Sequence, residues 1–175
     1  DKGYYCRIND EKNIVLISTK LFNNISKNSV EFLDKTLIHF DEKEVQEFSL
    51  RSGNETIRLI RQGDDKWNIA SPIKSKVNLA TINSLFFDLK EARISEFVKI
   101  SLDISEAFGL KTPKKSFIQK TKDGSQTILQ FGNQTSDGKK VFAKRKGEPT
   151  VFLISQSVVD KLFRSLHDLR NRKLL

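Results

Sequence analysis

The chain has 175 residues, of which 37% are hydrophobic and 30% are charged, and its net charge is +9. This apolar content is sufficient for a folded core and excludes a fully disordered chain. No stretch approaches the ~18 consecutive apolar residues that span a bilayer, and none has the order of a signal peptide. The excess of Lys and Arg favours an anionic partner: nucleic acid, phospholipid or acidic protein.

The chain contains no Met, and a strand-like run follows Asp1 almost at once. We therefore expect a part of a longer polypeptide, with any export signal or membrane anchor upstream. The one cysteine, Cys6, lies in an apolar run, which favours a buried and inert thiol. A single cysteine excludes an internal disulfide and a CxxC metal pair, and it does not distinguish the cytosol from an exported compartment.

The first predicted elements are two strands, a turn and a helix. Residues 4–18 read YYCRINDEKNIVLIS, with apolar runs on both sides of a polar turn. Ser18 can cap the helix, because its hydroxyl can accept from a free backbone N–H of the first turn. The apolar stripe of this helix is predicted at Leu21, Phe22, Ile25, Phe32 and Leu33.

The middle of the chain predicts a three-stranded meander and then a helix. Alternating runs at 45–50, 56–61 and 67–69 are separated by Gly-containing turns. Asn78 caps a helix whose apolar face is formed by Leu79, Ile82, Leu85, Phe86 and Leu89. The next predicted elements are a strand at 94–100, a short helix at 103–107 ended by Gly109, and a hairpin of 116–121 with 127–131.

The last segment predicts a second copy of the first one. Residues 140–154 form a strand, turn and strand, and Ser155 caps one helix carrying Val158, Val159, Leu162, Leu166 and Leu169. Residues 2–38 align with 139–175 without a gap and agree in apolar pattern, which we interpret as a structural repeat.

We predict an α+β fold of antiparallel sheets with helices packed on one face, because the linkers within each strand group are too short for parallel crossovers. The sheets are predicted to be built from repeated β-hairpin or meander-plus-helix units. In this interpretation residues 1–38 are the tail of a preceding repeat unit, formed by a β-hairpin and a helix. Residues 39–175 are one complete unit.

Several short motifs follow one another in a recognisable order. They are DKTLIHFD at 34–41 with Val45, GDDKWNI at 63–69 with Pro72, FGLKTP at 108–113, DG at 123–124 with FG at 131–132, and VFAKR at 141–145. The first motif recurs as DLRNRKLL at 168–175. In this order they resemble the domain-of-unknown-function 4340 family. The chain departs from the family at Asn78, which is often Asp, and at Phe108, which replaces Tyr.

The resemblance implies a protein of the bacterial cell envelope, on the extracytoplasmic or periplasmic side, with a membrane anchor outside this chain. Members of the family are often found alongside ABC-type transporter components similar to those of gliding motility. The resemblance therefore implies an accessory role with transporter subunits as protein partners. It identifies no ligand, and it carries over no catalytic residue because none is established in the family.

The residues themselves point to no reaction. His39 and His167 fall in different predicted elements, and no HExxH, GxSxG, Walker or GxGxxG motif is present. We predict that the protein is not an enzyme, and that it has no metal site, cofactor or small-molecule substrate. A cleft holding either histidine beside a carboxylate would favour a hydrolase instead.

Runs of basic residues are the best candidates for a functional surface. We predict contacts with an anionic partner at Lys114, Lys115, Lys139, Lys140, Lys144, Arg145 and Lys146. The simpler alternative is a solvated outer face, because charge runs usually serve solubility. The predicted function is a non-catalytic interaction or accessory domain. Its alternative is a basic nucleic-acid-binding module. The sequence shows neither a recognition-helix motif nor paired exposed aromatic residues beside the basic runs, and such modules commonly use these features.

Overall fold

The computed structural model describes residues 3–7, 12–26, 33–39, 41–63, 66–98 and 106–171. By its internal contacts the chain divides into two compact units, Asp1–Asp34 and Lys35–Leu175. None of the helices in the described ranges has the length and apolar character needed to cross a membrane.

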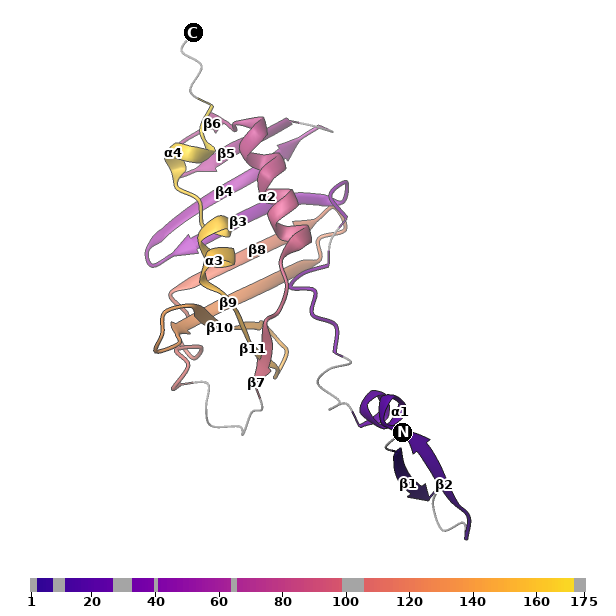
Figure 1. Cartoon of the computed structure of the whole chain (residues 1–175). Helices are drawn as coiled ribbons and strands as arrows, with labels where there is room; N and C mark the ends of the chain where they lie inside the picture. The colour runs from indigo at the N-terminus through magenta and orange to yellow at the C-terminus, as the bar shows by residue number, and fades with distance from the viewer. Residues whose placement is uncertain are drawn as a thin grey trace. The chain divides into compact units, whose positions relative to one another are not determined.

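The first unit is a β-hairpin followed by a short helix, as predicted (Figure 1). Its elements are β1 (Gly3–Arg7), β2 (Ile14–Ser18), which pairs antiparallel with β1, and α1 (Thr19–Ile25). Ser18 caps α1 as predicted, because its hydroxyl oxygen accepts from the Leu21 N–H at 3.2 Å. The helix is shorter than predicted, since it ends at Ile25 and Leu33 lies in a bend. Phe32 lies outside the described residues.

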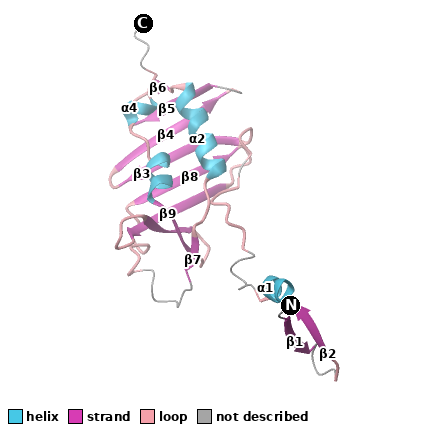
Figure 2. Ribbon diagram, viewed as in Figure 1, coloured by secondary structure: helices cyan, strands magenta, loops and turns pink. Residues whose placement is uncertain are grey.

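The second unit is built on one nine-stranded sheet (Figure 2). The strands lie in the order β6-β5-β4-β3-β8-β9-β10-β11-β7. They are β3 (Val45–Ser52), β4 (Glu55–Gln62), β5 (Lys66–Ser71), β6 (Ser75–Lys76), β7 (Glu96–Val98), β8 (Lys115–Thr121), β9 (Gln126–Gln134), β10 (Lys140–Arg145) and β11 (Val151–Ser155). Each strand pair described in it is antiparallel, which confirms the predicted sheet type.

The helices of this unit lie over one face of the sheet, as predicted (Figure 1). They are α2 (Leu79–Glu91), α3 (Gln156–Leu162) and α4 (Leu166–Leu169). α2 packs against both α3 and α4. We call the side of the sheet beneath these helices the helix face and the opposite side the open face.

Aromatic side chains of the helix face form the centre of the core. Phe48 in β3 is fully buried, and its ring centroid lies 5.5 Å from Trp67, 5.6 Å from Phe86 and 5.3 Å from Phe117. Contacts of this kind add to the stabilisation from buried area. Three strands and α2 therefore meet at one aromatic cluster.

The prediction of one helix over residues 155–169 is wrong. α3 ends at Leu162, and Phe163 takes φ −93° and ψ 61°, outside the helical region. Ser165 then caps α4, because its hydroxyl oxygen accepts from the Asp168 N–H at 3.2 Å. The apolar period continues across this break, which is why periodicity alone did not reveal it.

Two other predicted elements differ from the structure. The strand predicted at 94–100 is described only as β7 (Glu96–Val98), and residues 99–105, with most of the predicted short helix, lie outside the described residues. Gly109, predicted to end that helix, has φ 68° and closes a turn in which its N–H donates to the Glu106 carbonyl at 2.9 Å. β7 pairs with β11 and not with β8, which follows it along the chain.

The segment just after the division at Asp34 belongs to the second unit. Leu37 and Ile38 are buried, and the Arg145 guanidinium donates to the carbonyls of Thr36 and Leu37 at 2.8 Å and 3.3 Å. The assignment of residues 1–38 and 39–175 to two repeat units stays a prediction.

Gly132 provides a test of the packing around β9. A Cβ at this position would overlap the carbonyl oxygen of Phe108, which accepts from the Asn133 N–H at 2.7 Å. We expect Gly132→Ala to lower the free energy of unfolding by about 1–3 kcal/mol, because the loop must move away from the strand. Urea denaturation measures this loss. The control Gln126→Ala, exposed on the same strand, should change it by less than about 0.5 kcal/mol, and equal losses would contradict the close approach.

Candidate functional site

The structure distributes the seven predicted contact residues over both faces of the sheet. Lys140 and Lys144 lie on the open face, since they alternate with the buried residues of β10. Lys115 and Arg145 point to the helix face. The other three, Lys114, Lys139 and Lys146, lie in connections and are exposed. The seven side chains therefore do not form one patch.

Lys144 is part of a row that crosses the open face. The paired positions of this row are Arg51, Ser116, Gln130 and Lys144, on β3, β8, β9 and β10. Adjacent strands lie ~4.8 Å apart, so three strand spacings place the Cα atoms of Arg51 and Lys144 ~14 Å apart. Arg51 was missed as a site residue, although the alternation of its strand already placed it on the polar side.

The next row adds partly exposed apolar side chains. Ile118 in β8 lies directly opposite Ile128 in β9, and both are partly exposed. Lys120 lies on the same face two positions along β8 from Ile118. The open face thus combines one pair of apolar side chains with basic ones.

One ion pair neutralises part of the charge on the open face. Arg58 donates two hydrogen bonds to the Glu47 carboxylate, at 3.1 Å and 2.8 Å. This hydrogen bonding lowers the pKa of Glu47 and raises the pKa of Arg58. Lys140 pairs with Glu96 at 3.4 Å. Among the ion pairs of the described residues, none includes Arg51, Lys120 or Lys144, so this face keeps a positive charge.

Arg145 has a structural role that sequence reasoning did not foresee. Besides the carbonyls of Thr36 and Leu37, its guanidinium contacts Glu148 at 3.1 Å and lies 5.7 Å from the ring centroid of Phe152. Its donors are therefore directed at groups of its own chain. This makes Arg145 a weaker candidate than Lys144 for contact with a partner.

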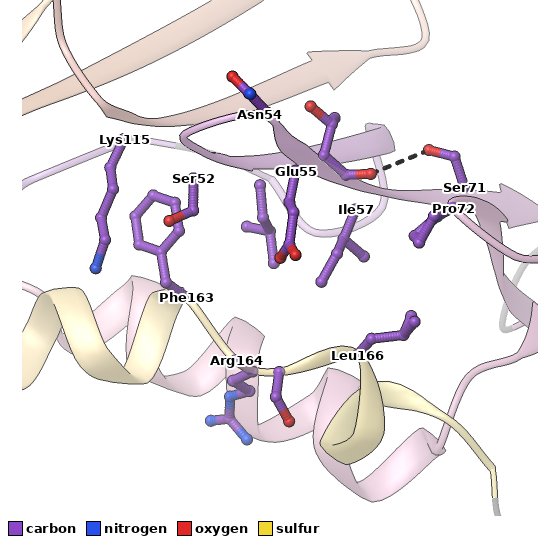
Figure 3. Close-up of a pocket in the computed structure, with 13 residues that line it drawn as sticks. Ser52, Asn54, Glu55, Ile57, Ser71, Pro72, Lys115, Phe163, Arg164 and Leu166 are labelled. Atoms are coloured by element: carbon purple, nitrogen blue, oxygen red, sulfur yellow. Dashed lines mark hydrogen bonds between the residues drawn. The ribbon is translucent and has the colours of Figure 1, made fainter.

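A cavity of about 730 Å³ lies between the sheet and the segment that joins α3 to α4. Figure 3 shows Glu55 and Ile57 reaching from β4 toward Phe163 and Leu166. Lys115 also lines this cavity, with its ammonium 5.2 Å from the Phe163 ring centroid. The volume lies within the range of small-molecule pockets. The sequence could not reveal the cavity, because its walls come from separate segments.

The cavity combines apolar walls with charged groups of both signs. Glu55 supplies a carboxylate and Lys115 an ammonium. Arg164 also lines it, but its guanidinium points toward α2 and contacts the Asp88 carboxylate and the Ser84 hydroxyl at 2.9 Å (Figure 3). The arrangement suits the binding of an amphipathic group.

A second cavity, of about 390 Å³, is lined by His39 and by the acidic residues Asp41, Glu44 and Asp123. This is the kind of cleft that would favour a hydrolase, so its chemistry matters. No group of three or more His, Cys, Asp or Glu side chains among the described residues could hold a metal ion.

The carboxylate of Asp123 in this cavity is held by its own turn. It accepts from the Thr121 hydroxyl at 2.6 Å and from the Ser125 N–H and hydroxyl at 3.0 Å and 2.7 Å. These hydrogen bonds lower the pKa of Asp123 to about 2. Such a carboxylate is a weak general base, and the Thr121 and Ser125 hydroxyls already donate to it. The arrangement is that of a structural turn.

The hydrogen bonds of this turn should be detectable in the titration of the Asp123 carboxyl group. The folded pKa lies below the ordinary value of 3.8, so the stabilisation from this group is present above pH ~4 and is lost as the pH falls toward 2. We expect Thr121→Val to raise the pKa of Asp123 toward 3.8, measured by carboxyl NMR. Thr135→Val is the matched control. Thr135 donates to Asp137 at 2.6 Å in an equivalent turn, so this variant should raise only the pKa of Asp137.

The role of Arg145 is tested against its neighbour Lys144. We expect Arg145→Met to lower the free energy of unfolding by about 1–3 kcal/mol, because two carbonyls lose a charged donor. Lys144→Met, on the opposite face of the same strand, should change it by less than about 0.5 kcal/mol. Thermal or urea denaturation of both variants measures the difference. Equal stability of the two variants would contradict the anchoring role of Arg145.

Comparison with known proteins places the chain in a family. No curated protein and no solved structure matches it. A family model does match, described as a domain of unknown function (DUF4340), over residues 1–113 and again over residues 101–175. Together these two matches span the whole chain, in agreement with the order of motifs in the sequence. The chain therefore belongs to the DUF4340 family.

Proposed function

We propose that the protein is a non-catalytic interaction domain, and that the open face of its sheet binds an acidic protein surface. The open face is the observation that carries this proposal. The helices cover only the other side of the sheet (Figure 1), and Arg51, Lys144 and the Ile118–Ile128 pair on the open face are exposed or partly exposed. The Arg51 guanidinium also donates to the Pro113 carbonyl at 3.1 Å, so of these two basic side chains Lys144 makes fewer contacts with its own chain among the described residues. Apolar contact would supply affinity there, and the basic side chains would supply orientation.

The proposed setting is the extracytoplasmic side of the bacterial envelope, with an anchor outside this chain. The proposed partners are subunits of an ABC-type transporter, for which the protein would be an accessory component. Both parts of this proposal rest on what the family resemblance implies.

We also propose that the chain contains the end of one repeat unit and one complete unit. One observation supports this: β1–β2 has the strand register of β10–β11 at a constant offset of 137 positions. A repeat whose units present similar sheets would offer a partner several related surfaces.

The experiment uses the natural full-length protein, tagged and expressed at its native level. We expect it in the membrane fraction, where crosslinking should capture transporter membrane subunits. The double variant Arg51→Glu with Lys144→Glu should reduce that capture roughly tenfold, which corresponds to ~1.4 kcal/mol of binding free energy. The control Lys74→Glu also replaces a basic residue by an acidic one, but in the exposed loop before β6. It should leave capture unchanged.

The alternative, a nucleic-acid-binding module, is favoured only by the net charge of +9 and by the basic side chains of Arg51, Lys120 and Lys144 on the open face. It predicts recovery in the soluble fraction with nucleic acid, and binding that weakens tenfold or more between low and physiological salt for several phosphate contacts. That outcome, or equal capture by the double variant and the control, would contradict the proposed function.

A further inference from the structure

We infer that β1, β2 and α1 form the contact surface for the sheet edge of another unit with the fold of residues 35–175, carried by the same polypeptide upstream of β1. This inference rests on the proposed repeat, and it adds the partner and the register of the contact.

The two hairpins agree in geometry residue by residue. Gly3 pairs with Ser18 as Lys140 pairs with Ser155, and the following pairs keep the same offset. The helices also correspond, since Thr19–Ile25 shifts onto Gln156–Leu162. Their first turns are capped by equivalent serines, and their last turns are closed by equivalent N–H···O bonds at 2.8 Å and 2.9 Å.

The two hairpins differ in burial. Ile14, Leu16 and Ile25 are 67%, 61% and 61% exposed, whereas their counterparts Val151, Leu153 and Leu162 are 3%, 8% and 0% exposed. Apolar side chains in the same register are therefore covered in one copy and exposed in the other. An isolated two-stranded hairpin is at best marginally stable in water, and its free edges can pair with further strands.

The second copy shows what covers such a hairpin. β9 pairs with β10 on one side, β7 pairs with β11 on the other, and α2 packs against α3. On the open face the Phe142 ring stacks on Phe108 at 4.0 Å. Tyr5, the counterpart of Phe142, is 79% exposed.

The same contacts predict the register of the missing partner. Ala143 lies opposite Phe131 in β9, so Cys6, its counterpart, should lie opposite the equivalent residue of a β9-type strand. Phe152 lies opposite Phe97 in β7, so Val15 should face a β7-type strand. The partner should therefore supply a β9-type strand, a β7-type strand and an α2-type helix. It should also supply an aromatic ring that stacks on Tyr5.

The connection between β9 and β10 favours a partner in the same polypeptide. Only residues 135–139 separate these two antiparallel strands, so a β9-type strand would reach β1 through a similarly short turn. A second copy of this chain fits less well, because its own β9 and β7 edges are already paired with β10 and β11.

Cys6, the one cysteine of this chain, reports the contact directly. It is partly exposed here, whereas its counterpart Ala143 is fully buried. In the natural polypeptide, read from its own start codon, we expect maleimide labelling of Cys6 to be slower by roughly tenfold or more, because local opening must precede reaction. Mass spectrometry of the Cys6 peptide measures the rate. Hydrogen exchange should show that outward-facing amides of β1 and β2 become protected, which burial without strand pairing would not produce.

Three results would overturn the inference. They are a gene that encodes no upstream unit, equal labelling and exchange in the two polypeptides, and a Cys6 that is already fully protected in residues 1–175. The last result would mean that the hairpin is covered within this chain.

A transplant separates this inference from the repeat on which it rests. Residues 3–25 replace residues 140–162, with Arg145 retained, in a chain whose original Cys6 is changed to Ser, so that the one remaining cysteine lies at the position of Ala143. If the hairpins are equivalent, the chain folds cooperatively and the transplanted thiol is protected, whereas the matched transplant carrying Val15→Asp exposes it. Failure of the transplant would contradict the repeat. Success of the transplant, with an unprotected Cys6 in the natural polypeptide, would contradict only the proposed partner.

Discussion

The antiparallel pairing of β3 with β8 holds the second unit together. It joins the meander β3-β4-β5-β6 to the group β8-β9-β10-β11-β7, and each group would otherwise end in an unpaired strand. Leu50 pairs with Phe117 at this seam, and Phe48 on the same strand contacts aromatic rings from β5, α2 and β8. The seam is thus both a set of backbone hydrogen bonds and the centre of the core. β3 and β8 are far apart in sequence, so pairing them costs loop-closure entropy. Local contacts alone do not offset this cost.

Because the helices cover one face of the sheet, the other face is the one that can contact a partner. α2, α3 and α4 bury the aromatic and aliphatic side chains that point toward them. Strand alternation then places every second residue on the open face. There the same strands carry basic side chains and the Ile118–Ile128 pair. The open face is therefore a consequence of how the core is built, and its charge is the part that sequence can vary without disturbing the core.

Local physics explains which elements could be predicted. Ser18, Asn78 and Ser155 cap their helices as expected, because a cap depends on residues within one turn. The hairpins and the meander follow from alternation and glycine turns. The pairing of β7 with β11, by contrast, depends on contacts between distant segments, and no local pattern encodes it. The cavity of Glu55 and Lys115 was missed for the same reason, and the break at Phe163 was hidden by an apolar period that continues through it.

The basic residues show that a charge run in the sequence does not by itself define a binding surface. Lys144 and Arg145 are neighbours in a charge run, and charge alone does not separate them, whereas the alternation of the predicted strand already places them on opposite faces. In the strand they point to opposite faces, one to the open face and one to the carbonyls of Thr36 and Leu37. A cation that satisfies two carbonyls of its own chain contributes to stability, whereas a cation on a solvated sheet face contributes little until a partner removes the water around it. Strand parity, not charge density, therefore decides which residues of a basic run are available for recognition.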